Sequence, residues 1–200
     1  MKQIVFIHGG MTFKRRSDYL DHLKEKELSI EPRKKWHGEY LRKRLKDFQI
    51  IKPDMPCKEN ARYAEWKIYF ERFLPFMNHG VILIGSSLGS IFLARYLSRN
   101  MFPKRISSLY LLGAPFDDTL PTEDLAGGFR LPKDISGIMQ ANKVTFLYSK
   151  DDDIVPVSHA EKYRKKLPNA EYVIFESKNG HFRIDKFPEI IRMIRKNKNY

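Results

Sequence analysis

The chain of 200 residues contains a single cysteine, Cys57, which excludes an internal disulfide framework and favours a reducing compartment. No apolar run is long enough to cross a bilayer. The N-terminus lacks the charged start, apolar run and small-residue cleavage site of a signal peptide. We therefore expect a cytoplasmic protein without a membrane span.

Acidic residues are scarce relative to basic ones, since 24 Asp and Glu stand against 37 Lys and Arg, a formal net charge of +13. Such a charge attracts nucleic acids, membranes and acidic substrates in general. The charges are spread along the chain and mixed with acids, and no helix-turn-helix, zinc-finger or RNA-recognition pattern is present. Solvated lysine-rich helices explain the charge better, and no specific nucleic-acid partner is expected.

Short apolar runs, typical of buried strands, alternate with helical patterns along the whole chain, without repeats or linkers. One helix is predicted from the spacing of Tyr40, Leu41, Leu45 and Phe48. The predicted strands cover residues 3–7, 49–51, 81–84, 107–112, 144–148 and 172–175. This alternation predicts one α/β domain over residues 1–200, with an open parallel sheet and helices on both faces.

The most informative stretch is residues 81–90, VILIGSSLGS, which is typical of a buried strand, a turn and the start of a helix. The turn Gly85-x-Ser87-x-Gly89 has the pattern of a nucleophile elbow. In so tight a turn the residues two before and two after the nucleophile come close together, so both should lack side chains. Ser87 has glycines at both places, whereas Ser86 would have two bulky aliphatic residues. The pattern therefore predicts Ser87 as a nucleophile.

A serine hydroxyl needs a base to take its proton, and the base needs a third group that fixes its tautomer. His181 follows the last predicted strand in a glycine turn, so it should lie at the same edge of the sheet as Ser87. We predict His181 as the base. His79 and His159 lie elsewhere in the pattern and are interpreted as surface residues.

The acid should follow the serine and precede the histidine, as it does in α/β-hydrolases. A run of three aspartates follows the strand at residues 144–148, and we prefer Asp152. Asp151 and Asp153 are interpreted as caps of the turn and of the following helix. Asp117 and Asp118, one strand earlier, are an alternative.

The first predicted strand ends in His8-Gly9-Gly10, and α/β-hydrolases take a second oxyanion-hole amide from a loop at this place. We predict an oxyanion hole formed by the N–H groups of Gly10 and Leu88, with Met11 in reserve for Gly10. His8 is interpreted as a loop histidine that bonds to the backbone.

Residues 12–37 are polar and strongly charged, with a thin apolar stripe. They are interpreted as a charged helical insertion. Because this insertion leaves the glycine loop, it could lie over the pocket as a partial lid. A solvated surface helix is an equally good interpretation.

Taken together, the motifs resemble the YdeN-like (retinoblastoma-binding-protein-like) small serine hydrolases, a compact branch of the α/β-hydrolase superfamily. The resemblance covers most of the chain. It is carried by His8-Gly9, Trp36, Met55-Pro56, Trp66, Gly85-Ser86-Ser87-Leu88-Gly89, Ser149-Lys150-Asp151-Asp152, Ile154-Val155-Pro156 and Gly180-His181-Phe182.

The resemblance implies a six-stranded sheet with a minimal cap, the triad Ser87, Asp152 and His181, and hydrolysis of small carboxylic esters without a cofactor or metal. The chain departs from the family in residues 12–35, which are longer than the family's loop, so the substrate preference is left open. A thioesterase or peptidase would use the same triad. A non-catalytic interaction module that keeps the fold is the alternative from another class, and the oligomeric state is not predicted.

Overall fold

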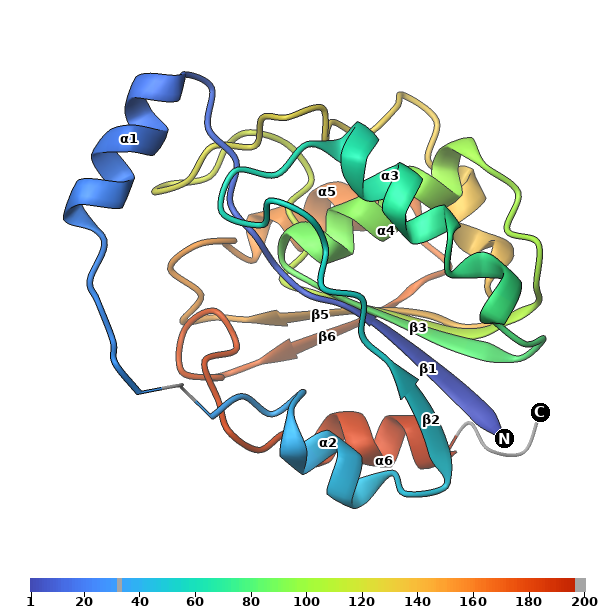
Figure 1. Cartoon of the computed structure of the whole chain (residues 1–200). Helices are drawn as coiled ribbons and strands as arrows, with labels where there is room; N and C mark the ends of the chain where they lie inside the picture. The colour runs from blue at the N-terminus through green and yellow to red at the C-terminus, as the bar shows by residue number, and fades with distance from the viewer. Residues whose placement is uncertain (32–33, 197–200) are drawn as a thin grey trace.

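The computed structural model describes residues 1–31 and 34–196 (Figure 1). Its strands are β1 (Lys2–Ile7), β2 (Phe48–Ile51), β3 (Val81–Ser86), β4 (Ile106–Leu112), β5 (Val144–Ser149) and β6 (Glu171–Phe175). Its α-helices are α1 (Arg16–Glu25), α2 (Glu39–Arg44), α3 (Tyr63–Glu71), α4 (Leu88–Arg99), α5 (Ser158–Lys166) and α6 (Pro188–Lys196), with short 3-10 helices at Leu74–Phe76 and Ser136–Gln140.

The strands form one sheet in the order β2-β1-β3-β4-β5-β6, and every described pairing between neighbours is parallel. The central strands are apolar almost throughout, because each is covered on both faces. The α/β fold with a parallel sheet of six strands is therefore confirmed.

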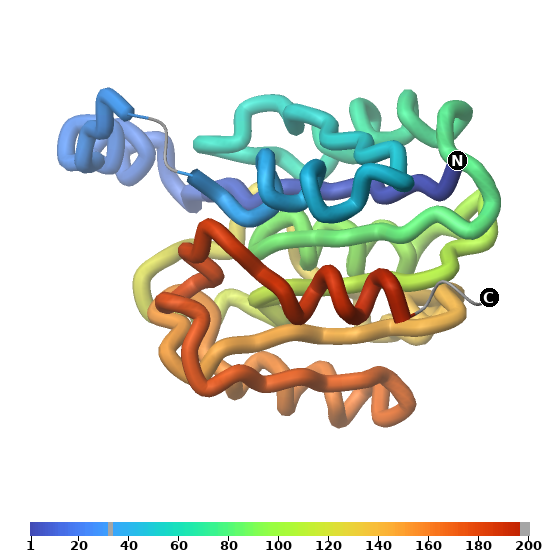
Figure 2. The backbone as a smooth tube through the Cα atoms, turned by 90° about the horizontal axis from the view of Figure 1, so that it is seen from below, coloured from blue at the N-terminus to red at the C-terminus, as the bar shows by residue number. Residues whose placement is uncertain are grey.

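Helices cover both faces of the sheet, as predicted (Figures 1 and 2). Helices α3, α4 and α5 lie on one face, over a core that includes Trp66, Phe70 and Phe92. Helices α2 and α6 lie on the other, over a smaller core that includes Trp36 and Phe187. Apolar packing on both faces fixes the positions of the strand ends.

The sheet reverses its direction of growth at β1, because the chain places β2 on one side of β1 and β3 on the other. Open α/β sheets bind ligands at the carboxyl ends of the strands where the order reverses. The loops that leave β1 and β3 at this point carry Gly9, Gly10 and Ser87. The topology therefore brings the predicted nucleophile next to the predicted oxyanion loop.

The charged insertion forms α1, which extends away from the sheet in Figure 1 and buries none of its residues. Ion pairs attach the insertion to the body of the protein: Lys14 lies 2.7 Å from Asp118, and Lys26 lies 2.6 Å from Glu59. Of the insertion predicted over residues 12–37, residues 16–25 are helical. Within residues 1–31 and 34–196, no helix has the length and apolar character needed to cross a membrane.

Candidate active site

Ser87 stands between β3 and α4 in a strained backbone conformation, with φ 54° and ψ −121°. Such a conformation costs a residue other than glycine about 1–3 kcal/mol and persists only where its surroundings enforce it. Here the Ser87 N–H donates to Leu112 O of the neighbouring strand at 2.8 Å, and the Ser90 N–H donates to Ser87 O at 2.8 Å. The turn is thus held by β4 on one side and by the first turn of α4 on the other.

Glycines flank Ser87 because the backbone leaves no room for side chains there. A Cβ atom on Gly85 would lie 2.6 Å from Ser90 Cα, and one on Gly89 would lie 2.3 Å from Ile7 O. Both distances are well inside van der Waals contact with backbone atoms. This is the crowding on which the choice of Ser87 over Ser86 depends.

His181 lies beside Asp152, with Nδ1 2.7 Å from Oδ2 and 2.9 Å from Oδ1. The Asp152 side chain is fully buried, and its Oδ1 also accepts the backbone N–H groups of Ile154 at 2.9 Å and Val155 at 2.8 Å. A carboxylate can only accept, so in the neutral imidazole the proton is on Nδ1 and Nε2 is free to act as a base. Nε2 is buried and has no hydrogen-bond partner in the described part of the chain.

The two earlier aspartates are engaged elsewhere. Asp117 accepts from Lys162 Nζ at 2.8 Å, and Asp118 accepts the Leu125 N–H at 2.7 Å. Neither makes an ion pair or hydrogen bond with His181. Among the candidate acids, only Asp152 is within hydrogen-bond distance of that imidazole.

The interpretation of Asp151 and Asp153 as caps was wrong, because α5 has no side-chain cap among the described residues and the N–H groups of Ile154 and Val155 bond to Asp152 instead. Asp151 accepts the Ser177 hydroxyl at 2.5 Å and the Gly180 N–H at 3.0 Å, and these hydrogen bonds, led by that of Gly180, hold the pKa of its carboxyl well below the usual range. Asp153 forms an ion pair with Arg183, with N···O distances of 2.9 Å. Three consecutive aspartates therefore each hold a different part of the loop that carries His181.

Two residues at the site were not predicted from the sequence. Gly113, which ends β4 at φ 50°, lies so close to the imidazole that a Cβ would be 2.7 Å from His181 Cε1. A glycine at the end of a predicted strand was a signal that could have found it. Glu123 lines the cavity from an aperiodic loop that gave no signal, and burial raises the pKa of its carboxyl.

The two residues predicted to supply the oxyanion hole, Gly10 and Leu88, are close in space. Gly10 packs against Leu88, because a Cβ on Gly10 would be 3.2 Å from Leu88 Cδ2. Leu88 is the first residue of α4, so its N–H has no partner within the helix. The Met11 N–H, which we held in reserve, already donates to Lys58 O at 2.8 Å. Of the two candidates in the glycine loop, Gly10 is the one whose N–H has no hydrogen-bond partner among the described residues.

His8 bonds to the backbone through both ring nitrogens. Nδ1 lies 2.6 Å from Gly9 O, and Nε2 accepts the Met55 N–H at 2.8 Å. This pairing places the proton on Nδ1, and burial lowers the pKa of the imidazole, so His8 stays neutral and structural.

The interpretation of His159 as a surface residue was wrong. Its side chain is fully buried, and Nδ1 accepts the Phe116 N–H at 2.9 Å. The reason is the orientation of α5, whose buried face consists of His159, Ala160 and Tyr163. His79 is exposed, as predicted.

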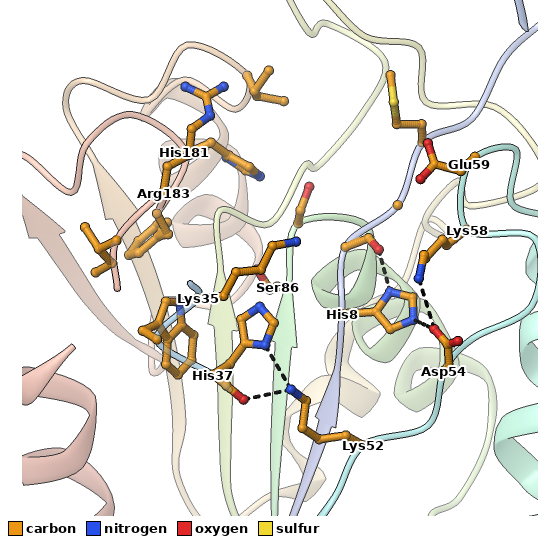
Figure 3. A pocket seen from close by; sticks show the side chains of 18 of the residues that line it. His8, Lys35, His37, Lys52, Asp54, Lys58, Glu59, Ser86, His181 and Arg183 are labelled. Carbon is orange, nitrogen blue, oxygen red and sulfur yellow. Dashed lines mark hydrogen bonds and ion pairs between the residues drawn. The ribbon is translucent and has the colours of Figure 1, made fainter. Parts of the chain in front are cut away.

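Ser87 and His181 line one cavity of about 620 Å³ at the carboxyl edge of the sheet. Figure 3 shows this cavity, with His181 and the neighbouring Ser86 labelled. The loops after β1, β2, β3 and β6 contribute to its wall, together with residues 34–37. Lys34 and Lys35, near the end of the charged insertion, line the cavity, whereas α1 does not. Met11, which precedes the insertion, also lines it. The described structure thus brings Ser87 and His181 to one cavity and pairs His181 with Asp152, not with the alternative acids Asp117 and Asp118.

Comparison with known proteins agrees with this geometry. Residues 29–193 match the model of a family described as serine hydrolase. The chain belongs to the serine hydrolase family. This hydrolase family model covers the serine turn, the aspartate run and His181, and it bears out the resemblance drawn from the sequence. No curated protein was found to match the chain.

Solved structures of similar fold include two YdeN-type proteins. The ydeN gene product of Bacillus subtilis is 21% identical, with a TM-score of 0.79 over the full length of both chains. A protein described as a YdeN-like hydrolase from Pectobacterium atrosepticum is 15% identical, with a TM-score of 0.63 over 98% of this chain and 90% of the other. A lipase-esterase related protein from Clostridium acetobutylicum is 15% identical, with a TM-score of 0.59 over 98% and 93%. At these identities the comparison shows a shared fold.

Proposed function

We propose that this serine hydrolase cleaves small carboxylic esters, with Ser87 as the nucleophile, His181 as the base and Asp152 as the acid that orients it. The observation that carries the proposal is that a strained serine turn and a buried aspartate–histidine pair open onto the same cavity. A thioester or amide passes through the same oxyanion chemistry, so the choice of esters rests on the resemblance and on the esterase-type fold.

In the first half of the reaction, Ser87 Oγ attacks the acyl carbonyl while His181 Nε2 takes the hydroxyl proton. The resulting oxyanion accepts hydrogen bonds from the N–H groups of Gly10 and Leu88. Each of these hydrogen bonds stabilises the transition state by roughly 3 kcal/mol. Collapse of the tetrahedral intermediate expels the alcohol, which receives its proton from His181. Asp152 keeps Nδ1 protonated throughout and stabilises the imidazolium.

In the second half, a water molecule attacks the acyl-enzyme. His181 takes a proton from this water and returns it to Ser87 Oγ as the acid leaves. No step requires a cofactor.

The proposal is tested by incubating the protein with a fluorophosphonate probe and locating the label by mass mapping. We expect the label on Ser87, and we expect Ser87→Ala to lose ester hydrolysis while its unfolding midpoint stays within the range of the native chain. Ser86→Ala is the matched control, because Ser86 lines the same cavity one residue earlier. A label on Ser86, or an active Ser87→Ala variant, would show that Ser87 is not the nucleophile.

We further propose that the charged insertion, residues 12–37, forms a partial lid over the cavity. Residues 34–37 at the end of the insertion line the cavity, although α1 does not. Replacing residues 16–30 by a short glycine-serine linker should widen the range of acyl chains accepted, as measured by kcat/KM over a series of 4-nitrophenyl esters. An unchanged dependence of kcat/KM on acyl-chain length would show that the insertion does not act as a lid.

A further inference from the structure

The cavity that contains Ser87 is rich in charge. The basic side chains that line it are Lys34, Lys35, Lys52, Lys58 and Arg183, and the acidic ones are Asp54, Glu59 and Glu123. The labelled residues of Figure 3 show how these groups divide. His181 and Arg183 lie on one side, His8, Asp54 and Lys58 lie on the other, and Lys35, His37 and Lys52 lie between them.

Ion pairs neutralise only part of this charge. The pairs that involve lining residues are Lys58 with Asp54 at 3.2 Å, Glu59 with Lys26 at 2.6 Å, and Arg183 with Asp153 at 2.9 Å. Lys34, Lys35 and Lys52 have no carboxylate partner in the part of the chain that the structure describes. The unbalanced positive charge is therefore concentrated on the wall formed by residues 34–37 and Lys52.

Lys52 is the most constrained of these cations. It is half-buried, and its Nζ lies 2.7 Å from His37 O, to which it donates, and 3.1 Å from His37 Nδ1. Both partners are neutral, and an ammonium group has three N–H donors. At least one donor is left for a ligand in the cavity.

The positive charges on this wall also contribute to lowering the pKa values of His37 and Lys52. Burial, followed by the charges of Lys52 and Lys35, lowers the pKa of His37 to about 3. Burial, followed by the charges of Arg42 and Lys35, also lowers the pKa of Lys52. A bound anion would offset the part of both shifts that comes from the neighbouring cations, because it would supply a counter-charge at this wall.

We propose that the substrate carries an anionic group, a carboxylate or phosphate apart from the scissile ester, that binds Lys35 and Lys52 in this cavity. This inference rests on the proposed ester hydrolysis at Ser87. The half-buried Glu123 does not oppose it, because the charges that act on Glu123 are those of the His181 side of the cavity: His181, Arg183, Asp152 and Asp153. The anion is thus assigned to the wall of Lys35 and Lys52.

The test compares matched esters that differ in one charge. For an anion on the acyl side, mono-4-nitrophenyl adipate is compared with 4-nitrophenyl hexanoate. For an anion on the alcohol side, 4-carboxyphenyl butyrate and 4-phosphonophenyl butyrate are compared with 4-carbamoylphenyl butyrate. We expect kcat/KM to favour the anionic ester by about tenfold in at least one arm, and to lose that preference as salt rises and screens the lysines.

Variants then separate a built site from the general attraction of a basic protein. Lys35→Gln and Lys52→Gln should each reduce the preference several-fold, measured within each variant as the ratio of kcat/KM for the anionic ester to kcat/KM for the neutral one. Lys24→Gln, which removes the same charge from α1 outside the cavity, should change nothing. Equal effects of all three substitutions, or no preference for the anion in any arm, would overturn the proposal.

A binding measurement distinguishes failure of the anion site from failure of the proposed ester chemistry. If the neutral esters are not hydrolysed, the proposed function fails, and calorimetric titration of Ser87→Ala with mono-4-nitrophenyl adipate still measures anion binding. Binding that is lost in the double variants Ser87→Ala with Lys35→Gln or Lys52→Gln would support the anion site. The same titration is made with 4-carboxyphenyl butyrate for the alcohol side, and undetectable binding of both esters to Ser87→Ala would refute the site, even in an active esterase.

Discussion

Replacing Asp152 by asparagine tests the proposed acid with almost no change of shape. Oδ1 accepts two backbone N–H groups, from Ile154 and Val155, while Oδ2 faces His181 Nδ1 at 2.7 Å. The amide oxygen of an asparagine would take the Oδ1 position, because turning the NH₂ group there would leave two backbone donors without an acceptor, at about 1–3 kcal/mol each. The NH₂ group would therefore face His181.

This orientation decides the size of the effect. A donor opposite Nδ1 forces the imidazole proton onto Nε2, where no lone pair is left to accept the serine proton. Loss of the tautomer-fixing acid lowers kcat by roughly 10⁴-fold in a serine protease, equivalent to about 5.5 kcal/mol of transition-state stabilisation. We expect Asp152→Asn to show a fall of this order, with both backbone hydrogen bonds kept and stability lowered by about 1 kcal/mol or less.

The assay is steady-state hydrolysis of 4-nitrophenyl butyrate, combined with urea unfolding of the same samples. Asp117→Asn is the matched control, because Asp117 pairs with Lys162 and makes no contact with His181. Asp152→Ala should lose stability as well as activity, since it removes the acceptor of two buried N–H groups. An Asp152→Asn variant within tenfold of the native rate, beside a strongly impaired Asp117→Asn, would refute the reasoning.

Two further substitutions test how the site is held. Asp151→Asn should lower kcat about ten- to a hundredfold with little change in KM, because a small displacement of the loop around Gly180 misplaces the imidazole. Asp117→Asn again serves as the control, and a loss that arises in KM with kcat unchanged would contradict a positioning role. Gly89→Ala should destabilise the fold by about 3 kcal/mol, since its Cβ would be 2.3 Å from Ile7 O; an unchanged urea midpoint would show that the elbow can relax.

The parts of the protein that depend on local pattern were predictable. Alternating strands and helices indicated the sheet, and flanking glycines singled out Ser87, because both signals lie within a few residues of sequence. Phe48 shows the limit of this reasoning: its spacing from Leu45 fits a helix, yet it begins β2 and pairs with Lys2. Strand pairing with β1 outweighed the helical spacing there.

Features that depend on contacts between distant loops were not predictable. Lys35 and Lys52 belong to one site only because residues 34–37 and the loop after β2 line the same cavity. His159 looked like a surface residue because its burial depends on how α5 packs, not on its neighbours in sequence. The role of Asp151 was likewise hidden, since its partners Ser177 and Gly180 follow the next strand.

The three aspartates that hold the His181 loop also limit how the protein can be recombined. Asp151, Asp152 and Asp153 reach Gly180, His181 and Arg183 in the same order along both loops. An insertion or deletion of one residue in either loop would break all three contacts at once. A chimera that takes the loop after β6 from a related hydrolase should therefore stay active only when the loop after β5 comes from the same parent.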